Sequence, residues 1–195
     1  MDFCAERIIK QRLSSERASH SVRVLDTALE LAEGSKIDLE KVRLAALLHD
    51  YAKEVPPEKM LLIAREQQLL TCAAEEAQPD LLHAPVGSWL CRSELGIEDE
   101  EILQAIRYHT TGRKDMSALD IIIYLADLIE PGRSFDKADE LRRVCRQDIY
   151  QGLLMAFDLT ICHVIERRFL IHPFTVEARN SILLKLAHKD IKTEE

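Results

Sequence analysis

The amino-acid sequence predicts an all-α fold, a single helical bundle. Nearly every segment repeats apolar residues at helical spacing, and no segment sustains the alternation of apolar and polar residues that marks a strand. The 195 residues suit one domain with a sizeable core, and they contain no internal repeat. Six Gly and six Pro are too few for a flexible linker or a disordered arm. We therefore expect one domain over residues 1–195, with its core over about 15–135 and C-terminal helices over 136–195 packed on that core.

Three helices are expected in the first third of the chain. The first carries an apolar stripe that ends near Gly34, and the stripe consists of Val22, Leu25, Leu29 and Ala32. Asp38 is typical of an N-cap and predicts a helix that continues through Leu48. Pro56-Pro57 opens the third helix, which continues to Gln68, because proline suits the first helical turn.

The remaining two thirds of the chain predict five further helices. They are expected over residues 84–95, 98–109, 117–130, 136–169 and 175–188. Pro131-Gly132 ends the third of these, and Thr175 is expected to cap the last. Two polar breaks, at residues 107–113 and 171–175, separate helices and contain histidines and hydroxyl groups. Loops held by rigid helices are where chemistry is usually found.

Charge and cysteine content limit the function classes. The net charge of −8 argues against a general nucleic-acid binder, which needs an excess of Lys and Arg, whereas a small nucleotide needs only a local group of cations. The five cysteines are scattered and form no C-x-x-C pair, which favours reduced thiols in a cytosolic protein. No signal peptide is visible, and the most apolar segment, 119–129, is too short to span a bilayer. We expect a cytoplasmic protein with no membrane or nucleic-acid partner.

The sharpest local feature is the pair His49-Asp50. It ends the apolar run 44–48. Burying an ionised carboxylate there costs on the order of several kcal/mol of folding free energy, unless a cation compensates its charge. By itself the pair could also be a packed histidine beside a turn-capping aspartate. His20 lies 29 residues upstream, and Asp127 interrupts an otherwise apolar helix. Two imidazoles and two carboxylates form a mixed nitrogen and oxygen ligand set that suits Fe, Mn, Co or Zn.

The order His, His-Asp, Asp on helices resembles the HD-domain metal-dependent phosphohydrolases. A narrower resemblance covers nearly the whole chain and is carried by five motifs in order, at residues 46–54, 83–87, 106–112, 124–133 and 172–180. The motifs are similar to those of the bacterial YqeK family, with no departure at these positions. Members of that family are HD-domain hydrolases that split diadenosine tetraphosphate symmetrically and carry iron. The resemblance therefore implies a single HD domain with this activity.

The resemblance also implies roles for individual residues. The metal ligands would be His20, His49, Asp50 and Asp127, binding one ion of iron (or Mn, Co or Zn). The catalytic residues would be Asp50, Lys53, His83 and His109, of which the two histidines face the phosphates or bind a second ion. The substrate would be held by Arg17, His83, His109, Thr110, Asp127, Arg133, Leu170, Ile171, His172, Pro173, Phe174, Thr175 and Asn180. Structural alternatives stay open for six of these. Lys53 could be a solvated cation, His109 a helix-dipole partner and Thr175 an N-cap only. Asp127 could lie on the surface of its helix, His83 could only mark a helix start, and Arg17 is not distinguished from its neighbours Arg12 and Arg23.

The expected reaction is hydrolysis of a dinucleoside polyphosphate to two nucleoside diphosphates by a metal-activated water. The expected partner is thus a small-molecule nucleotide, and a homodimer is one option for the oligomeric state. Two alternatives remain. The chain could be another HD-domain nucleotide phosphohydrolase (a nucleotidase, a dNTP hydrolase or a phosphodiesterase), or a nucleotide sensor that binds without turnover.

Overall fold

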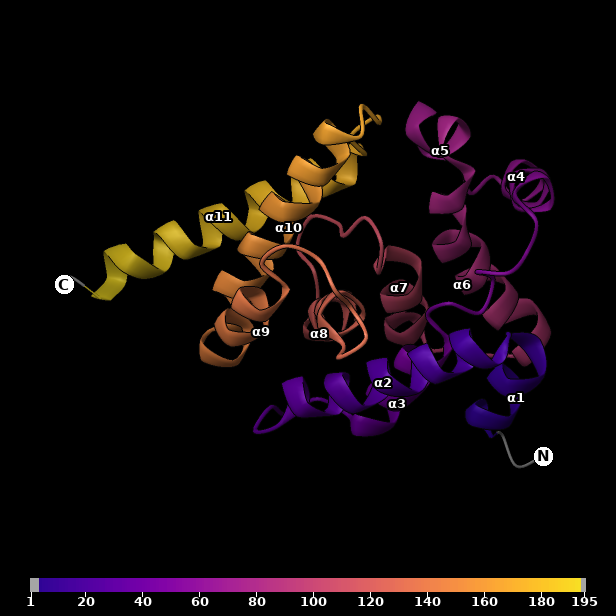
Figure 1. Ribbon diagram of the computed structural model, residues 1–195, viewed down its shortest axis with the longest axis horizontal. Coiled ribbons are helices and arrows are strands. Elements are labelled where there is room, and N and C mark those ends of the chain that lie inside the picture. The colour runs from indigo at the N-terminus through magenta and orange to yellow at the C-terminus, as the bar shows by residue number, and fades with distance from the viewer. Residues whose placement is uncertain (1–3, 194–195) are drawn as a thin grey trace.

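The computed structural model describes residues 4–193, and this part of the chain is helical, without strands (Figure 1). The predicted all-α class is therefore confirmed. In chain order the elements are α1 (Ala5–Arg12), α2 (Ser15–Ala32), α3 (Leu39–Leu48), α4 (Pro57–Glu66), α5 (Ala73–Ala77), the 3-10 helix η1 (Pro79–Leu82), α6 (His83–Leu95), α7 (Glu100–Tyr108), α8 (Ala118–Ile129), α9 (Ala138–Gln147), α10 (Ile149–Glu166) and α11 (Pro173–Thr193).

Side-chain caps fix the start of three of the helices that position the site. Asp38 accepts a hydrogen bond from the backbone N–H of Glu40 (2.9 Å) and begins α3, as predicted. Asp99 caps α7 in the same way. Ser117 caps α8 in a capping box with Asp120, whose carboxylate accepts from the Ser117 N–H (2.9 Å). These caps set where α3, α7 and α8 begin.

The prediction of a single helix over 136–169 is wrong, because the helix is interrupted at Asp148. This residue has extended backbone (φ −151°, ψ 110°), and its carboxylate accepts from the N–H groups of Tyr150 (2.8 Å) and Gln151 (3.2 Å). Aspartate competes for backbone donors and so favours a cap over a helix interior. The break lets α9 and α10 pack closely, since a Cβ at Gly152 would lie 2.5 Å from the Cys145 sulfur.

The expected capping role of Thr175 is also wrong. The last helix begins at Pro173, in keeping with the preference of proline for the first turn. Thr175 is buried, and its hydroxyl donates to the carbonyl oxygen of Thr111 (2.9 Å), 64 residues away in the chain. The hydroxyl therefore ties the start of α11 to the turn that follows α7.

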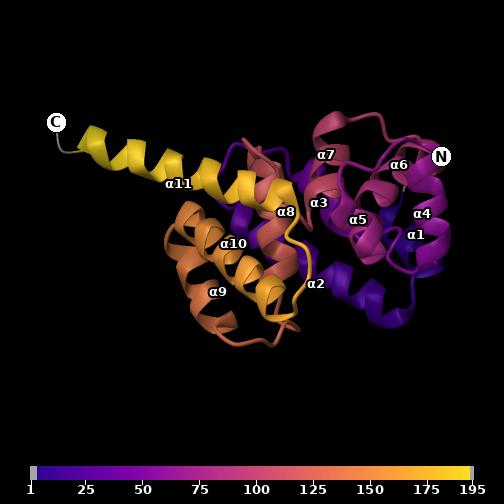
Figure 2. The same ribbon diagram turned by 90° about the horizontal axis from the view of Figure 1, so that it is seen from above.

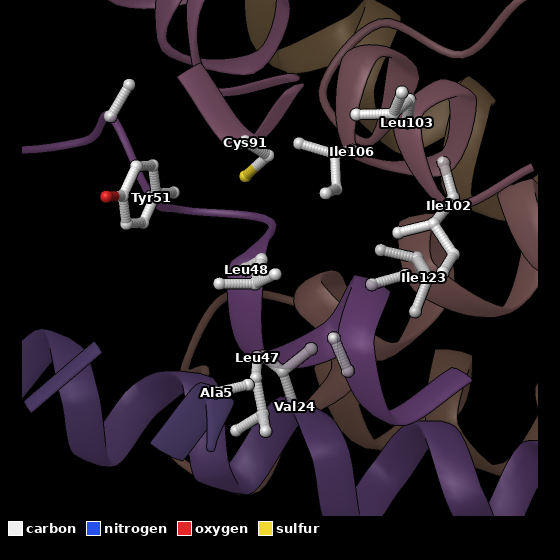
Figure 3. Close-up of a cluster of buried hydrophobic side chains, with 14 of the residues drawn as sticks. Ala5, Val24, Leu47, Leu48, Tyr51, Cys91, Ile102, Leu103, Ile106 and Ile123 are labelled. Carbon is white, nitrogen blue, oxygen red and sulfur yellow. The ribbon is translucent and has the colours of Figure 1, made fainter. Parts of the chain in front are cut away.

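Two clusters of buried side chains form the core. The first lies among α1, α2, α3, α6, α7 and α8, and Figure 3 shows Leu48, Ile106 and Ile123 within it. The second lies between α8 and the C-terminal helices, around Leu125 and Phe157. Residues 119–126 of α8 are all buried, because this helix contributes to both clusters (Figures 1 and 2). The central position of α8 explains why its sequence is apolar on nearly every face.

The C-terminal helices differ from the rest in exposure. The outer half of α11 extends away from the body of the molecule (Figure 2). By length and composition alone, the 18 residues of α10 could cross a bilayer, with a mean hydropathy of 1.2. Its buried residues Leu153, Ala156 and Phe157 instead belong to the second core cluster. All five cysteines are free thiols, as expected from their spacing.

Candidate metal centre

Six metal-competent side chains from five helices converge between α2, α3 and α8. His20 lies in the second turn of α2, His49 and Asp50 follow the end of α3, and His83 begins α6. His109 follows the end of α7, and Asp127 lies near the end of α8. All are buried except the partly buried Asp127, and His49 has no exposed surface at all. Such a concentration of buried polar groups needs a partner to offset the cost of desolvation.

One group of ligand atoms forms around Asp127 and one oxygen of Asp50. The Nε2 atom of His20 lies 3.0 Å from Asp127 Oδ1 and 3.8 Å from Asp50 Oδ2. The Nε2 atom of His49 lies 3.7 Å from Asp50 Oδ2 and 3.8 Å from Asp127 Oδ1. These four residues are the ligand set that the sequence resemblance implied. Ligand atoms of His20, His49 and Asp50 all lie within 4.8 Å of one another, and Asp127 forms a second such group with His49 and His109.

A second group forms around the other oxygen of Asp50. Asp50 Oδ1 lies 3.3 Å from His83 Nε2 and 3.8 Å from His109 Nε2. The two imidazole nitrogens are 3.0 Å apart. Asp50 therefore points one carboxylate oxygen at each group, an arrangement suited to a ligand shared by two cations.

The outer nitrogens of all four imidazoles face hydrogen-bond acceptors. These Nδ1 atoms contact Glu130 Oε1 (from His20, 3.2 Å), the carbonyl of Ala46 (from His49, 2.7 Å), the carbonyl of Asp80 (from His83) and the carbonyl of Ile106 (from His109, 2.7 Å). Each acceptor places a hydrogen on Nδ1, so in the neutral imidazole Nε2 presents a lone pair to the interior. This is the outer hydrogen bonding that metal-ligating histidines generally show.

The pKa shifts of His109 and Asp50 favour the binding of a cation. Burial first, and then the neighbouring His83 and His49, lower the pKa of His109 to about 3, which keeps its imidazole neutral near pH 7. Burial alone would raise the pKa of Asp50, but His49, His83 and His109 hold it well below its usual range. A neutral His109 imidazole and an ionised Asp50 carboxylate are the forms in which these two groups bind divalent metals. The buried His and Asp cluster thus fits a divalent metal site.

Two guanidinium groups flank the centre. Arg17 lies 3.3 Å from Asp50 Oδ2. Arg133 donates from Nε to the Asp127 carbonyl (2.8 Å) and contacts the Asp127 carboxylate. Lys53 lies behind the centre, where its Nζ is 3.1 Å from Asp80 Oδ2 and 3.3 Å from His83 Nδ1. The two arginines are thus next to the ligand carboxylates, whereas Lys53 contacts only the outer side of His83.

A sharp turn presents His109 and Thr110 to the centre. Gly112 has φ +65°, and a Cβ there would lie 2.6 Å from the Phe157 ring. Only glycine fits this left-handed conformation without displacing the ring. The Thr110 hydroxyl oxygen is buried and, among the described residues, has no hydrogen-bond partner.

The turn at 170–175 lies apart from the six converging side chains. Leu170, Ile171 and Pro173 are exposed, as is Asn180 on α11. The ring of Phe174 packs edge-on against Tyr108 at the end of α7 (centroids 5.8 Å apart). The structure therefore places this turn beside the end of α7, not among the metal-competent groups.

His172 in this turn belongs to a third cluster with Cys72 and Glu75. The backbone N–H of Phe174 donates to His172 Nδ1 (3.2 Å), so the hydrogen of the neutral ring is on Nε2. That Nε2 lies 3.4 Å from Glu75 Oε1. In this tautomer Nε2 carries the hydrogen and faces the Glu75 carboxylate, which places the turn next to α5.

The sequence reasoning missed Glu130 and Asp80, which hold the outer nitrogens of His20 and His83. Glu130 is buried and also accepts from Arg23 Nε (2.6 Å) and the Gly132 N–H (2.6 Å). Its position in the motif at 124–133, directly before Pro131-Gly132, was the available signal, because a carboxylate next to a buried helix end needs a partner.

Replacing Glu130 by glutamine is expected to weaken metal binding about 10- to 100-fold, the usual cost of losing a hydrogen bond to a ligating histidine. The amide keeps the volume but loses the charge that orients His20. Competition with a chelator measures the affinity. Glu30→Gln is the matched control, since it makes the same change at an exposed glutamate of α2 that pairs with Arg146 and not with His20. Equal affinities in Glu130→Gln and the unmodified protein would contradict this role.

Comparison with known proteins adds a family and several relatives. Residues 17–132 match the family model described as HD domain. The protein named symmetrical bis(5'-nucleosyl)-tetraphosphatase of Bacillus subtilis (strain 168) is 42% identical over 168 residues, which cover 86% of this chain and 89% of that protein. The protein of the same name from Halalkalibacterium halodurans is 39% identical over 184 residues, covering 93% of this chain and 96% of that protein.

A solved structure resembles most of the chain. It is the crystal structure of a predicted HD superfamily hydrolase involved in NAD metabolism from Clostridium acetobutylicum, with a TM-score of 0.88 and 41% sequence identity. The match covers 93% of this chain and 96% of that one. The likeness therefore extends beyond the residues matched by the family model, to the helices at the C-terminus.

Proposed function

The chain belongs to the HD domain family, and we propose that it hydrolyses diadenosine tetraphosphate and related dinucleoside polyphosphates symmetrically, to two nucleoside diphosphates. Two relatives at 39–42% identity over most of the chain carry the corresponding name. The observation that carries the proposal is the position of Asp50, which points one oxygen at His20 and His49 and the other at His83 and His109.

His20, His49, Asp50 and Asp127 would hold one divalent metal, and Asp50, His83 and His109 a second. The mixed nitrogen and oxygen donors suit iron, which we propose, and also Mn, Co or Zn. When bound, the metal polarises the phosphoryl group and supplies an activated water at neutral pH. Asp50 would be the ligand shared by both ions, and its pKa, which is held well below the usual range, makes it a poor acceptor for a proton from water.

The side chains around the metals bind and orient the phosphates. Arg17 and Arg133 exchange their carboxylate partners for phosphate oxygens and offset the charge that develops on the transferred phosphoryl group and the departing diphosphate. Thr110 donates its free hydroxyl to the substrate. Lys53 positions His83 from behind, through Asp80, and does not contact the phosphates.

We further propose that residues 136–195 complete the nucleotide site, with the turn at 170–175 and Asn180 near a nucleoside. Packing supports this arrangement, because Thr175 and Phe174 join the start of α11 to the turn that presents Thr110. The five free thiols are in keeping with work in the reducing cytoplasm.

Product analysis tests the proposed function. The metal-loaded protein is incubated with diadenosine tetraphosphate in ¹⁸O-labelled water, and early products are separated. ADP is expected as the sole initial product, with the label in one of the two ADP molecules. Equimolar AMP and ATP would contradict symmetric cleavage. Turnover of dNTPs or cyclic nucleotides alone would indicate another HD-domain activity, and binding without turnover of any nucleotide would indicate a sensor.

A further inference from the structure

A cavity of about 360 Å³ opens directly from the metal centre, between α8 and α10. His109 and Asp127 belong to both the centre and the lining of this cavity. Its other walls come from the turn after α7, from α8, from the loop before α9 and from α10 (Figure 2 shows α8 beside α10). The volume lies within the range of small-molecule sites, roughly 300–1,000 Å³.

The outer walls of the cavity are apolar. They are formed by Leu128 of α8, Leu159 of α10 and the ring of Phe135 from the intervening loop. Leu128 and Leu159 are half-buried, and Phe135 is 37% exposed, although a phenylalanine ring on a loop gains by burial. A flat aromatic wall opposite aliphatic side chains suits the face of a planar ring.

The inner end of the cavity is polar. The hydroxyl groups of Tyr124 and Thr160 lie 3.2 Å apart, and either could donate to the other, so the pair keeps donor and acceptor capacity for a ligand. Thr110 also lines this space, and its buried hydroxyl oxygen has no hydrogen-bond partner among the described residues. A buried hydroxyl without a partner needs an explanation, and a small rotation of the Thr110 side chain toward the cavity would let a bound ligand supply that partner.

Thr110 also lines a second space, beside Phe174 and Glu75, but that space holds only about 10 Å³. No heterocyclic base fits there without displacing side chains. Of the two spaces that meet at Thr110, the one between α8 and α10 is therefore the one with room for a nucleoside.

We propose that the cavity between α8 and α10 binds the ribose and base of one nucleoside of the substrate, with the base stacked on Phe135. This inference rests on the proposed function and deepens it by naming the nucleoside subsite. The base lies between Phe135 and Leu159, the ribose lies near Thr110, and the attached diphosphate reaches the metals past Asp127. A dinucleotide has two nucleosides, so the turn at 170–175 stays available to the second.

Steady-state kinetics of Phe135→Ala test the subsite. The KM for diadenosine tetraphosphate is expected to rise about ten-fold, the scale of one base–aromatic stacking contact. The kcat and the metal content are expected to stay unchanged, because Phe135 is not among the residues that could hold a metal ion. Leu62→Ala, at an exposed apolar residue of α4, is the control that should change nothing. An unchanged KM in Phe135→Ala, with ADP still formed, overturns the subsite and leaves the proposed function standing.

A binding experiment keeps the inference testable without turnover. Phe135→Trp places a fluorescent reporter in the wall, and the response of the parent protein, with its one tryptophan at position 89, is subtracted. ADP is expected to quench the reporter, whereas inorganic tripolyphosphate, which lacks a base, is not. Phe169→Trp carries the reporter beside the turn at 170–175 instead. Quenching of Phe169→Trp but not of Phe135→Trp by ADP overturns the proposal in favour of that turn.

Discussion

Replacing Asp50 by alanine is expected to remove most of the bound metal and to lower turnover by more than about 10³-fold. The carboxylate points at both groups of histidines, so its loss removes a ligand from each. The loss should therefore exceed the ~10²–10³-fold cost of deleting a single electrostatic contact in an active site. Elemental analysis of the purified variant measures the metal, and release of ADP from diadenosine tetraphosphate measures the activity.

Matched variants separate the two groups of ligands. Asp127→Ala should lose the ion held by His20 and His49, and His83→Ala should lose the ion held with His109, so each should retain part of the metal that Asp50→Ala loses. Asp26→Ala replaces an exposed aspartate on α2 and should keep full metal and activity. Circular dichroism checks that every variant is folded. Full metal content in folded Asp50→Ala would remove this residue from the ligand set.

The helices that carry the site were predictable because their signals are local. Asp38 and the capping box at Ser117 lie next to regular apolar spacing, and the structure confirms helices at both places. Periodicity alone could not bring His20, His49 and Asp127 together, since it gives the face of a helix and not the helix that this face meets. The resemblance to known motifs supplied that convergence, which the distances among these residues now show.

Other features depended on tertiary contacts that the sequence does not display. Asp148 interrupts an apolar pattern that predicts one long helix. Its carboxylate accepts a hydrogen bond from a backbone N–H group of the next helix, and this cap ends the continuous helix. Thr175 has a side chain that suits an N-cap, but its hydroxyl instead donates a hydrogen bond to a carbonyl oxygen 64 residues away in the chain. Glu130 could not be assigned to His20, because the two residues are 110 positions apart.

Replacing Arg133 by alanine is expected to lower kcat by about 10²–10³-fold at saturating metal, the usual cost of losing one charged contact to a developing anion. Burial would lower the pKa of Arg133, but Asp127 outweighs it and raises the pKa, so the guanidinium stays charged. Arg142 donates to the Arg133 carbonyl (2.6 Å) and holds this part of the loop in place. The backbone at position 133 is therefore held at the edge of the centre by a contact that does not depend on the Arg133 side chain.

The comparison with lysine separates charge from geometry. Arg133→Lys keeps the cation but cannot make two parallel hydrogen bonds, so it should recover only part of the lost kcat. Arg146→Ala removes an exposed arginine paired with Glu30 and should leave the kinetics unchanged. If Arg133 only positions Asp127, the alanine variant will lose metal affinity and regain full kcat once metal is in excess. A kcat that stays low with metal in excess requires the guanidinium to act on the phosphates, because the metal ligands are then occupied and only the charge beside them is missing.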